Sequence, residues 1–474
     1  MATEDVNGSA SARGEDRVSL STKIGYGVGD FGANLVFQVL LFFLMYYFTD
    51  VLGIKPEVAG IIVLASKSWD AVSDPLMGTI SDKTNSRWGK KRPYLLFGSL
   101  PAAIAMLLLF YSPNFSGSEE AIMRMRIIWG LLTYILFCTT ITIVNVPYAS
   151  LTAAMTRDSH ERSVITGYRQ SFGIVGTLVA AGATLPLVEL LGGGDPIIGF
   201  RMLGLCYGSV LVVVTLIAFG STRERVTDLG GGPGKEMKLS QYALTVVKNR
   251  PFMILLVGTL MYMLAMNTIA SVLVYYFKYN LDAEKLIAFA NLGIFIPALL
   301  SIPLFIYIGK KTSKKFAYNT GMGIVGAILV VLFFFAEKSL VLTFICLAVA
   351  GIGLSTNWLS PWAIIPDTVE YSEWKLGIRN EGILYGAFFF VFKFAGAMGG
   401  FVVGKVLDFM GYIANQPQTD RSLLGIKLLF TLIPLCFIIM GMIILSFFPI
   451  DAKKHREMID EIEKRKAEGA PIGA

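Results

Sequence analysis

Residues 69–98 have the sequence WDAVSDPLMGTISDKTNSRWGKKRPYLLFG. Residues 69–80 are a mostly apolar run that contains two carboxylates, Asp70 and Asp74. Residues 81–93 form a polar loop with five basic residues, which are Lys83, Arg87, Lys90, Lys91 and Arg92. Lys and Arg concentrate in the cytoplasmic loops of membrane proteins. The segment therefore predicts a membrane-spanning helix that ends at the cytoplasm and carries acidic groups inside the bilayer.

The composition of the whole chain agrees with a membrane protein. Of 474 residues, 54% are hydrophobic and 16% are charged, whereas soluble domains carry roughly 25% charged residues. Intrinsic disorder is excluded, because it requires low hydrophobicity. The net charge of +7 comes without a basic stripe interleaved with aromatics, so no nucleic-acid partner is expected. Contact with anionic membrane lipid explains the charge.

Hydrophobic stretches recur along the chain at the length that spans a bilayer. Twelve begin near Ile24, Val58, Tyr94, Ile127, Val164, Met202, Pro251, Lys285, Phe316, Leu340, Ile383 and Leu424. Lys and Arg concentrate on alternate connections, which predicts that both termini are cytoplasmic. Residues 1–20 contain no apolar core of a removable signal peptide. We expect an all-α membrane protein of twelve transmembrane helices, located in a bacterial-type plasma (inner) membrane.

The chain divides near its middle. Residues 222–250 include the run GGGPG and interrupt the hydrophobic pattern, which predicts a cytoplasmic linker. We expect a tail at 1–23, six-helix bundles at 24–221 and 251–450, and a second tail at 451–474 that is solvated or contacts lipid headgroups. Residues 74–84 and 302–312 share Pro, Leu, Ile, Lys and Thr at one offset of 228 residues. This repeat indicates two pseudo-symmetric bundles of the major facilitator type.

Polar residues within the predicted spans are the candidates for chemistry, because an ionised group at the bilayer centre costs roughly 2.5–3.5 kcal/mol. They are Asp30, Asn34 and Gln38 in span one; Lys67, Asp70 and Asp74 in span two; Thr142, Asn145 and Tyr148 in span four; Arg169 and Gln170 in span five; and Lys393 in span eleven. The three acids and three bases neutralise one another only if these spans converge.

Each candidate also has a purely structural interpretation. Asp70 and Asp74 bind a cation or a proton in one interpretation, and only pair with Lys67 and Lys393 in the other. Asn34 and Gln38 are typical of hydrogen bonds between membrane helices. For Trp358 the two interpretations are stacking on a sugar and packing against a neighbouring helix.

An enzymatic function is disfavoured, because no nucleophile–base pair or phosphate-binding glycine loop is visible. The histidines, His160 and His455, lie in charged segments and are not expected to form a metal centre. The four cysteines lie inside apolar runs without metal-ligand spacing.

Several motifs resemble those of one transporter family. Besides residues 69–98, they are GYGVGDFGANL around Asp30, YYFTDVLGI at 46–54, IVNVPYASL at 143–151 and IPDTVEYSEWKLGIRNEGILYG at 365–386. Together they resemble the glycoside–pentoside–hexuronide:cation symporters over almost the whole chain. The resemblance implies the major facilitator fold and coupled transport of a sugar and a cation.

The resemblance also implies roles for individual residues. The candidates for the cation site are Asp70, Asp74, Thr142, Ser73 and Lys393, with Asp70 and Asp74 as ligands of Na⁺ if coupling is to sodium. The candidates for the substrate site are Asp30, Asn145, Tyr148, Arg169, Gln170, Trp358 and Lys393. The candidates for a cytoplasmic gate are Arg87, Asp367, Glu370 and Arg379.

Some positions depart from the family pattern. Asn145 occupies the place of a second sugar-binding acid, Ala149 that of a stacking aromatic and Gln170 that of an arginine. Galactoside specificity is therefore not implied. Ser73 stands where an asparagine contributes to cation selectivity, so Na⁺, Li⁺ and H⁺ remain open as coupling ions.

The sequence thus favours a secondary active transporter that couples uptake of a sugar or glycoside to inward movement of Na⁺ or H⁺. No other cofactor is implied. The alternative is a carrier of the same fold for a lipid or another amphiphilic solute, which would require a continuous apolar track in place of hydroxyl-binding groups.

Overall fold

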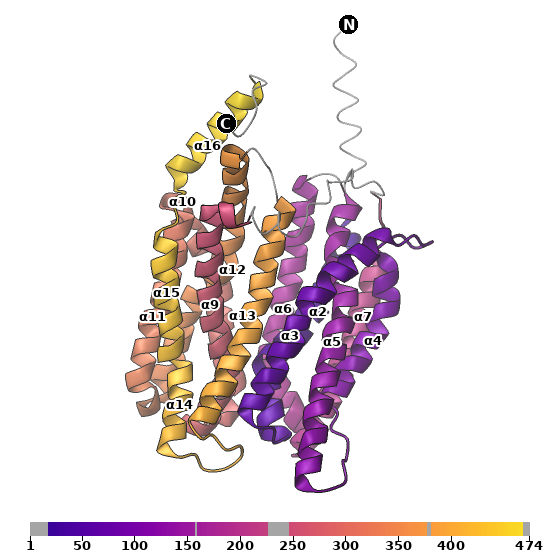
Figure 1. The fold of residues 1–474 in the computed structure, drawn as a ribbon, viewed down its shortest axis with the longest axis vertical. Helices are drawn as coiled ribbons and strands as arrows, with labels where there is room; N and C mark the ends of the chain where they lie inside the picture. The colour runs from indigo at the N-terminus through magenta and orange to yellow at the C-terminus, as the bar shows by residue number, and fades with distance from the viewer. Residues whose placement is uncertain (1–17, 157–158, 226–245, 377–380, 468–474) are drawn as a thin grey trace. The chain divides into compact units, whose positions relative to one another are not determined.

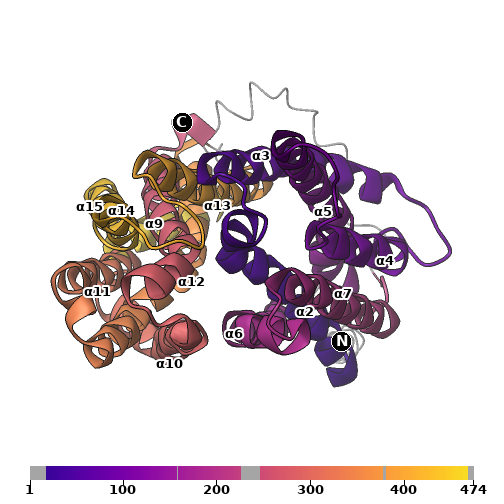
Figure 2. The ribbon, with the colours of Figure 1, turned by 90° about the horizontal axis from the view of Figure 1, so that it is seen from below.

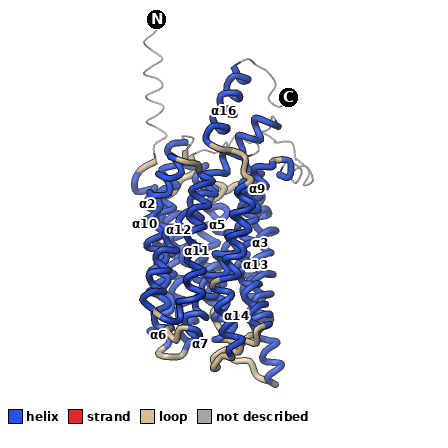
Figure 3. The backbone as a smooth tube through the Cα atoms, turned by 90° about the vertical axis from the view of Figure 1, so that its left-hand side faces the viewer, coloured by secondary structure: helices blue, strands red, loops and turns tan. Residues whose placement is uncertain are grey.

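The computed structural model describes residues 18–156, 159–225, 246–376 and 381–467 (Figure 1). Within these ranges the regular structure is helical and contains no strand, as Figure 3 shows. The chain forms two compact units. The first consists of Met1–Ile54 and Ile61–Gly232, and the second of Lys55–Gly60 and Pro233–Ala474.

Each unit is built from long helices, which Figure 2 shows from below. The first unit contains α2 (Leu20–Tyr46), most of α3 (Pro56–Lys83), α4 (Arg92–Leu109), α5 (Glu119–Met155), α6 (Ser159–Gly192) and α7 (Pro196–Ser221). The second contains α9 (Arg250–Tyr275), α10 (Ile287–Lys311), α11 (Lys314–Phe335), α12 (Leu340–Leu376), α13 (Glu381–Phe409), α14 (Asp420–Phe430), α15 (Leu432–Ser446) and α16 (Ala452–Ala467).

The length and hydropathy of these helices confirm the all-α membrane fold. In the described part of the chain, 11 helical segments are long and apolar enough to cross a bilayer, and α14 and α15 together make one of them. Among the described helices of 18 residues or more, the one outside this group is α3, whose 28 residues include Lys67, Asp70 and Asp74. With α3 the helices match the twelve predicted spans in order. The least apolar span is thus the one that carries the candidate cation ligands.

Local sequence signals set the helix boundaries. Side chains of Ser118, Asp195 and Ser313 accept hydrogen bonds from backbone N–H groups in the first turns of α5, α7 and α11, which satisfies donors that a helix start leaves unpaired. The repeated segments occupy corresponding positions, because α3 ends at Lys83 and α10 ends at Lys311. These two ends are separated by the offset of the repeat.

Glycines allow close helix packing in both units. A Cβ atom on Gly176 of α6 would lie 2.4 Å from the carbonyl oxygen of Phe31 on α2. A Cβ on Gly353 of α12 would lie 2.3 Å from the carbonyl oxygen of Gly321 on α11. Only glycine fits such backbone contacts, which are typical of membrane helix pairs. The α2–α6 contact matters for the site, because it brings Asp30 to Arg169.

The sequence predicts a tail that is solvated or contacts lipid headgroups, whereas the structure shows a helix that packs on the second unit. Residues 452–467 form α16, which packs on the end of α12 (Figure 1). Met458 is fully buried and Ile462 is 4% exposed. Trp374 of α12 donates a hydrogen bond from Nε1 to Glu461 (2.8 Å), and Arg465 donates one to the carbonyl oxygen of Trp374 (3.2 Å). The tail is therefore an amphipathic helix with its apolar side against the second unit.

Candidate functional site

The contact between α3 and α5 brings together part of the predicted cation site. The hydroxyl of Thr142 donates a hydrogen bond to Oδ1 of Asp74 at 2.9 Å. Thr142, Asp70 and Ser73 are buried. The buried Oγ of Ser73 makes no hydrogen bond to any residue that the structure describes. Carboxylate and hydroxyl oxygens are the ligands that hard cations prefer, so this group of side chains has the chemistry of a cation site.

Lys67 supplies positive charge on the same helix. Its Nζ lies 3.7 Å from Oδ2 of Asp70 and sits 4.9 Å from the ring centroid of Phe37 and 6.0 Å from that of Tyr134. At 3.7 Å the ion pair with Asp70 is longer than a hydrogen-bonded one. Lys67 therefore supplies positive charge to the buried carboxylate of Asp70.

Asp30 is held by Arg169 across the α2–α6 contact. Nη2 of Arg169 lies 3.0 Å from Oδ1 of Asp30, and the two side chains are 19% and 10% exposed. The guanidinium carbon sits 5.4 Å from the ring centroid of Tyr26 and 4.9 Å from that of Tyr148. Stacking of a guanidinium on aromatic rings is stabilising when water is excluded. Arg169 therefore has one fixed orientation beside Asp30.

Reciprocal hydrogen bonds fix the two tyrosines. The hydroxyl of Tyr26 donates to the carbonyl oxygen of Tyr148 at 2.5 Å, and the hydroxyl of Tyr148 donates to the carbonyl oxygen of Tyr26 at 2.5 Å. Thr152 lies 2.9 Å from the Tyr26 hydroxyl and 3.4 Å from Nη1 of Arg169. The result is a rigid polar cluster on α2, α5 and α6. Sequence reasoning missed Tyr26 and Thr152, although both lie one helical turn from a predicted site residue.

The remaining predicted substrate residues are placed as follows. Asn145 on α5 is half-buried, and Gln170 on α6 is exposed. Trp358 on α12 stacks on Phe295 of α10, with ring centroids 5.6 Å apart and an interplanar angle of 6°. Lys393 is half-buried on α13 in the second unit. Their roles in binding stay predictions.

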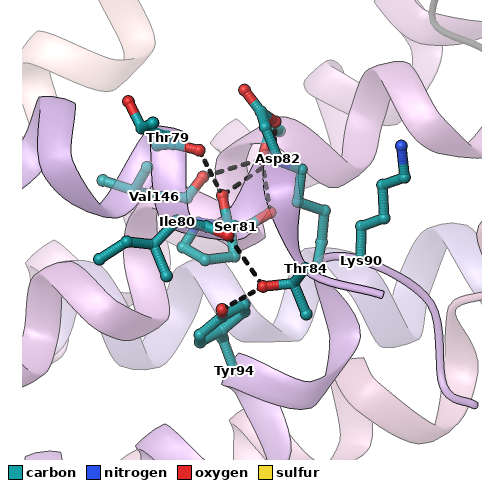
Figure 4. A network of polar contacts seen from close by, with 12 residues as sticks. Thr79, Ile80, Ser81, Asp82, Thr84, Lys90, Tyr94 and Val146 are labelled. Carbon is teal, nitrogen blue, oxygen red and sulfur yellow. Dashed lines mark hydrogen bonds and ion pairs between the residues drawn. The ribbon is translucent and has the colours of Figure 1, made fainter. Parts of the chain in front are cut away.

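The basic loop between α3 and α4 is ordered by local partners (Figure 4). The hydroxyls of Thr84 and Tyr94 lie 2.5 Å apart, and Lys91 donates a hydrogen bond to Ser81 (2.9 Å) and forms an ion pair with Asp82. The guanidinium of Arg87, a predicted gate residue, lies 4.0 Å from the ring centroid of Trp88.

Glu224 binds the loop between α3 and α4. Its carboxylate accepts hydrogen bonds from the backbone N–H groups of Lys90 at 2.9 Å and Lys91 at 2.7 Å. A carboxylate is stabilised at the start of a helix by unpaired N–H groups and by the helix dipole. Glu224 therefore holds the loop at the beginning of α4.

The predicted gate acids of the second unit meet partners that the sequence did not identify. Lys314 Nζ lies 2.7 Å from Oδ1 of Asp367, and His455 Nε2 lies 2.5 Å from Oε2 of Glu370 and 3.6 Å from Oδ1 of Asp367. The third gate residue of this unit, Arg379, lies outside the described residues.

His455 lies in a group of side chains that could bind a metal ion, whereas the sequence predicted no metal centre at either histidine. Ligand atoms of Asp367, Glu370 and His455 lie within 4.8 Å of one another, which is close enough to hold a metal ion. Lys314 already supplies positive charge to Asp367. We therefore interpret the group as an ion-pair cluster that joins α16 to α12.

In the described residues, the 11 long apolar segments together with α3, six in each unit, and the buried charges of the first unit define a membrane transporter of the major facilitator type. The family model "MFS/sugar transport protein" matches residues 25–452. The chain belongs to this family, and the resemblance to its glycoside–pentoside–hexuronide:cation symporters is confirmed. It is a transporter and not an enzyme.

Two relatives and one solved structure illustrate the similarity. The chain is 36% identical to the uncharacterized symporter YnaJ of Bacillus subtilis (strain 168), over 95% of this chain and 96% of that protein. It is 31% identical to the isoprimeverose transporter of Lactiplantibacillus pentosus, over 97% of this chain and 94% of that protein. A crystal structure of a mutant of the nucleoside transporter NupG matches 89% of this chain and 99% of that chain with a TM-score of 0.64 at 16% identity. The last match shows a shared fold.

Proposed function

We propose that this protein is a symporter that takes up a sugar or glycoside together with Na⁺ or H⁺. The observation that carries the proposal is the arrangement of α2, α3, α5 and α6. These helices hold two acids, each with a polar partner from a neighbouring helix: the half-buried Asp74 with Thr142, and the buried Asp30 with Arg169. The relatives named as a symporter and as an isoprimeverose transporter support both halves of the proposal.

Asp70 and Asp74 form the cation site in this proposal. Two carboxylates one helical turn apart repel each other when no cation is bound. Entry of Na⁺, or protonation of one acid, removes that penalty. Thr142 and Ser73 contribute hydroxyl oxygens, and Lys393 is the candidate residue from the second unit.

The cluster around Asp30 forms the sugar site. A carboxylate accepts hydrogen bonds from sugar hydroxyls, and a guanidinium donates them. The Tyr26–Tyr148 pair holds both groups in place, so the site loses little conformational entropy when a sugar binds. Asn145, Gln170, Tyr148 and Trp358 are the further candidates for contact with substrate. Polar groups in this cluster favour a sugar over a lipid-like solute.

Coupling follows from linkage. If bound cation favours the helix arrangement that binds sugar, bound sugar must favour cation binding by the same free energy. Transport then proceeds by alternating access, in which residues 1–221 rock against residues 251–450. The gate candidates form and break ion pairs during that motion. Both termini, the linker at 222–250 and the tail at 451–474 are cytoplasmic in this proposal.

A panel of labelled glycosides, pentosides and uronides tests the function in sealed vesicles that contain the purified protein. The proposal predicts accumulation of at least one of them above equilibrium when a Na⁺ or H⁺ gradient is imposed. Dissipating the gradient with an ionophore should abolish accumulation but leave exchange of labelled for unlabelled sugar. Gradient-independent movement of every sugar in the panel would contradict it.

A further inference from the structure

A cavity in the second unit lies apart from every predicted transport residue except Asp367. Its volume is about 420 Å³, and it is formed by α10, α11, α12 and the segment that leads from α15 into α16. Most of the lining is apolar and includes Phe305, Ile306, Leu359, Ile364 and Phe448. This volume and this lining are typical of sites that bind a ligand with an apolar body.

Basic side chains surround the cavity in excess over acidic ones. The basic lining residues are Lys310, Lys314, Lys315, His455 and Arg456, and the acidic ones are Asp367 and Asp451. Three of the basic side chains are already engaged. His455 contacts Glu370. Lys314 pairs with Asp367, and Lys315 donates hydrogen bonds to the carbonyl oxygens of Ser446 (3.2 Å) and Phe448 (2.9 Å).

The second acid is also engaged locally. Asp451 accepts a hydrogen bond from the backbone N–H of Lys454 at 2.7 Å, and that bond holds the pKa of the Asp451 carboxyl below its usual range. Lys310 and Arg456 are exposed and form no ion pair with any other residue in the described ranges. Both line the cavity, which therefore presents two uncompensated positive charges.

One wall of the cavity carries an exposed apolar side chain. Ile306 lines the cavity and is 40% exposed, and the adjacent Tyr307 is 54% exposed. In a membrane-spanning helix such side chains are covered by acyl chains. The cavity thus combines an apolar approach with a cationic rim at the helix ends beside α16.

We propose that this cavity binds an anionic phospholipid, with the phosphate between Lys310 and Arg456 and the first part of an acyl chain against Ile306 and Phe305. Basic pockets between membrane helices select anionic headgroups in this way. The proposal requires that α10 spans the membrane, but it does not depend on cation coupling or on the identity of the sugar.

Lipid binding also affects the tail in this proposal. Arg456 and His455 belong to α16 and line the cavity, so the complete site exists only when α16 is docked on α12. A bound phosphate therefore stabilises the docked tail. By linkage, undocking of the tail weakens lipid binding.

The test uses a photoactivatable phosphatidylglycerol added to the purified full-length protein in phosphatidylcholine nanodiscs. The variant K310E/R456E is compared with K311E/K453E, which makes the same charge changes at neighbouring residues that do not line the cavity. Lys311 instead lies 4.6 Å from the ring centroid of Tyr307. We expect crosslinks within residues 305–317 and 448–456, reduced roughly thirtyfold in K310E/R456E and unchanged in the control.

Protection of the tail gives a second readout. Phosphatidylglycerol should slow cleavage of α16 by trypsin in the parent and in the control but not in K310E/R456E. The milder K310Q/R456Q should give an intermediate loss of crosslinking, and it replaces K310E/R456E if that variant fails to fold. Equal labelling by a phosphatidylcholine probe, equal loss in the control variant, or full competition by soluble glycerol phosphate at the same concentration would overturn the assignment to an anionic lipid.

Discussion

Replacing Asp30 with asparagine separates the structural and the binding roles of the buried pair on α2 and α6. The substitution keeps the shape of the side chain but leaves the Arg169 guanidinium, 19% exposed, without its carboxylate. Breaking a buried ion pair by removing one partner costs roughly 3–5 kcal/mol. Because Arg169 keeps some solvent contact and its aromatic neighbours, we expect the lower limit, about 3 kcal/mol, or roughly 150-fold in the unfolding equilibrium.

The variants Asp30→Asn, Arg169→Gln and the double variant complete the cycle. The double variant leaves two neutral amides that can hydrogen-bond to each other, so its free energy of unfolding should exceed that of Asp30→Asn. Sugar affinity should behave differently. It should fall at least tenfold, about 1.4 kcal/mol, in both Asp30→Asn and the double variant, because each lacks the charged acceptor.

Denaturant unfolding in mixed micelles measures stability, and titration calorimetry measures binding of the sugar that the uptake panel identifies. If the double variant is no more stable than Asp30→Asn, the two residues are not coupled as the 3.0 Å contact implies. If Asp30→Asn binds sugar as tightly as the parent, Asp30 is a structural residue alone.

Three further substitutions or conditions probe other contacts. Gly176→Ala should destabilise the first unit by roughly 1–3 kcal/mol, because its Cβ would lie 2.4 Å from the α2 backbone. The control is Gly167→Ala on the same helix, whose Cβ would have no atom within 4 Å. Its thermal unfolding should resemble that of the parent. Thr142→Val should weaken cation binding by roughly tenfold or more, measured by calorimetry, whereas Thr140→Val should not, because that hydroxyl bonds only to its own helix backbone. Hydrogen bonds from Trp374 and Arg465 hold the pKa of Glu461 below its usual range. This contribution to tail docking should persist from neutral pH down to that range and be lost as pH falls below it. Amide hydrogen exchange of α16 that has the same pH profile in Glu461→Gln as in the parent would contradict this.

The fold was largely predictable because the bilayer imposes a simple rule on sequence. A span needs about 20 apolar residues, and basic loops mark one side. The α3 helix was still recognisable, although Lys67, Asp70 and Asp74 lower its hydropathy, because a hydrophobic stretch begins near Val58 and a basic loop follows it. The cost of isolated charge in the membrane also predicted that Asp30 needs a basic partner.

Other parts of the site depended on tertiary packing that no periodic pattern reveals. Tyr26 is one of 19 tyrosines, and its bond to the Tyr148 carbonyl follows only from the close approach of α2 and α5. The contact of His455 with Glu370 is not predictable from a local pattern, because the two residues are 85 positions apart in the sequence. The spacing of His455, Met458 and Ile462 on one helical face was the available signal for docking.

Gradient-driven uptake by Asp74→Cys tests the central claim most directly. The measurement compares this variant with Asp460→Cys, which alters an exposed carboxylate on α16, in vesicles that carry equal amounts of each protein. We predict that Asp74→Cys inserts normally but no longer accumulates sugar against its gradient, while Asp460→Cys accumulates it like the parent. Accumulation by Asp74→Cys at the parent rate would contradict the assignment of this carboxylate as the coupling site.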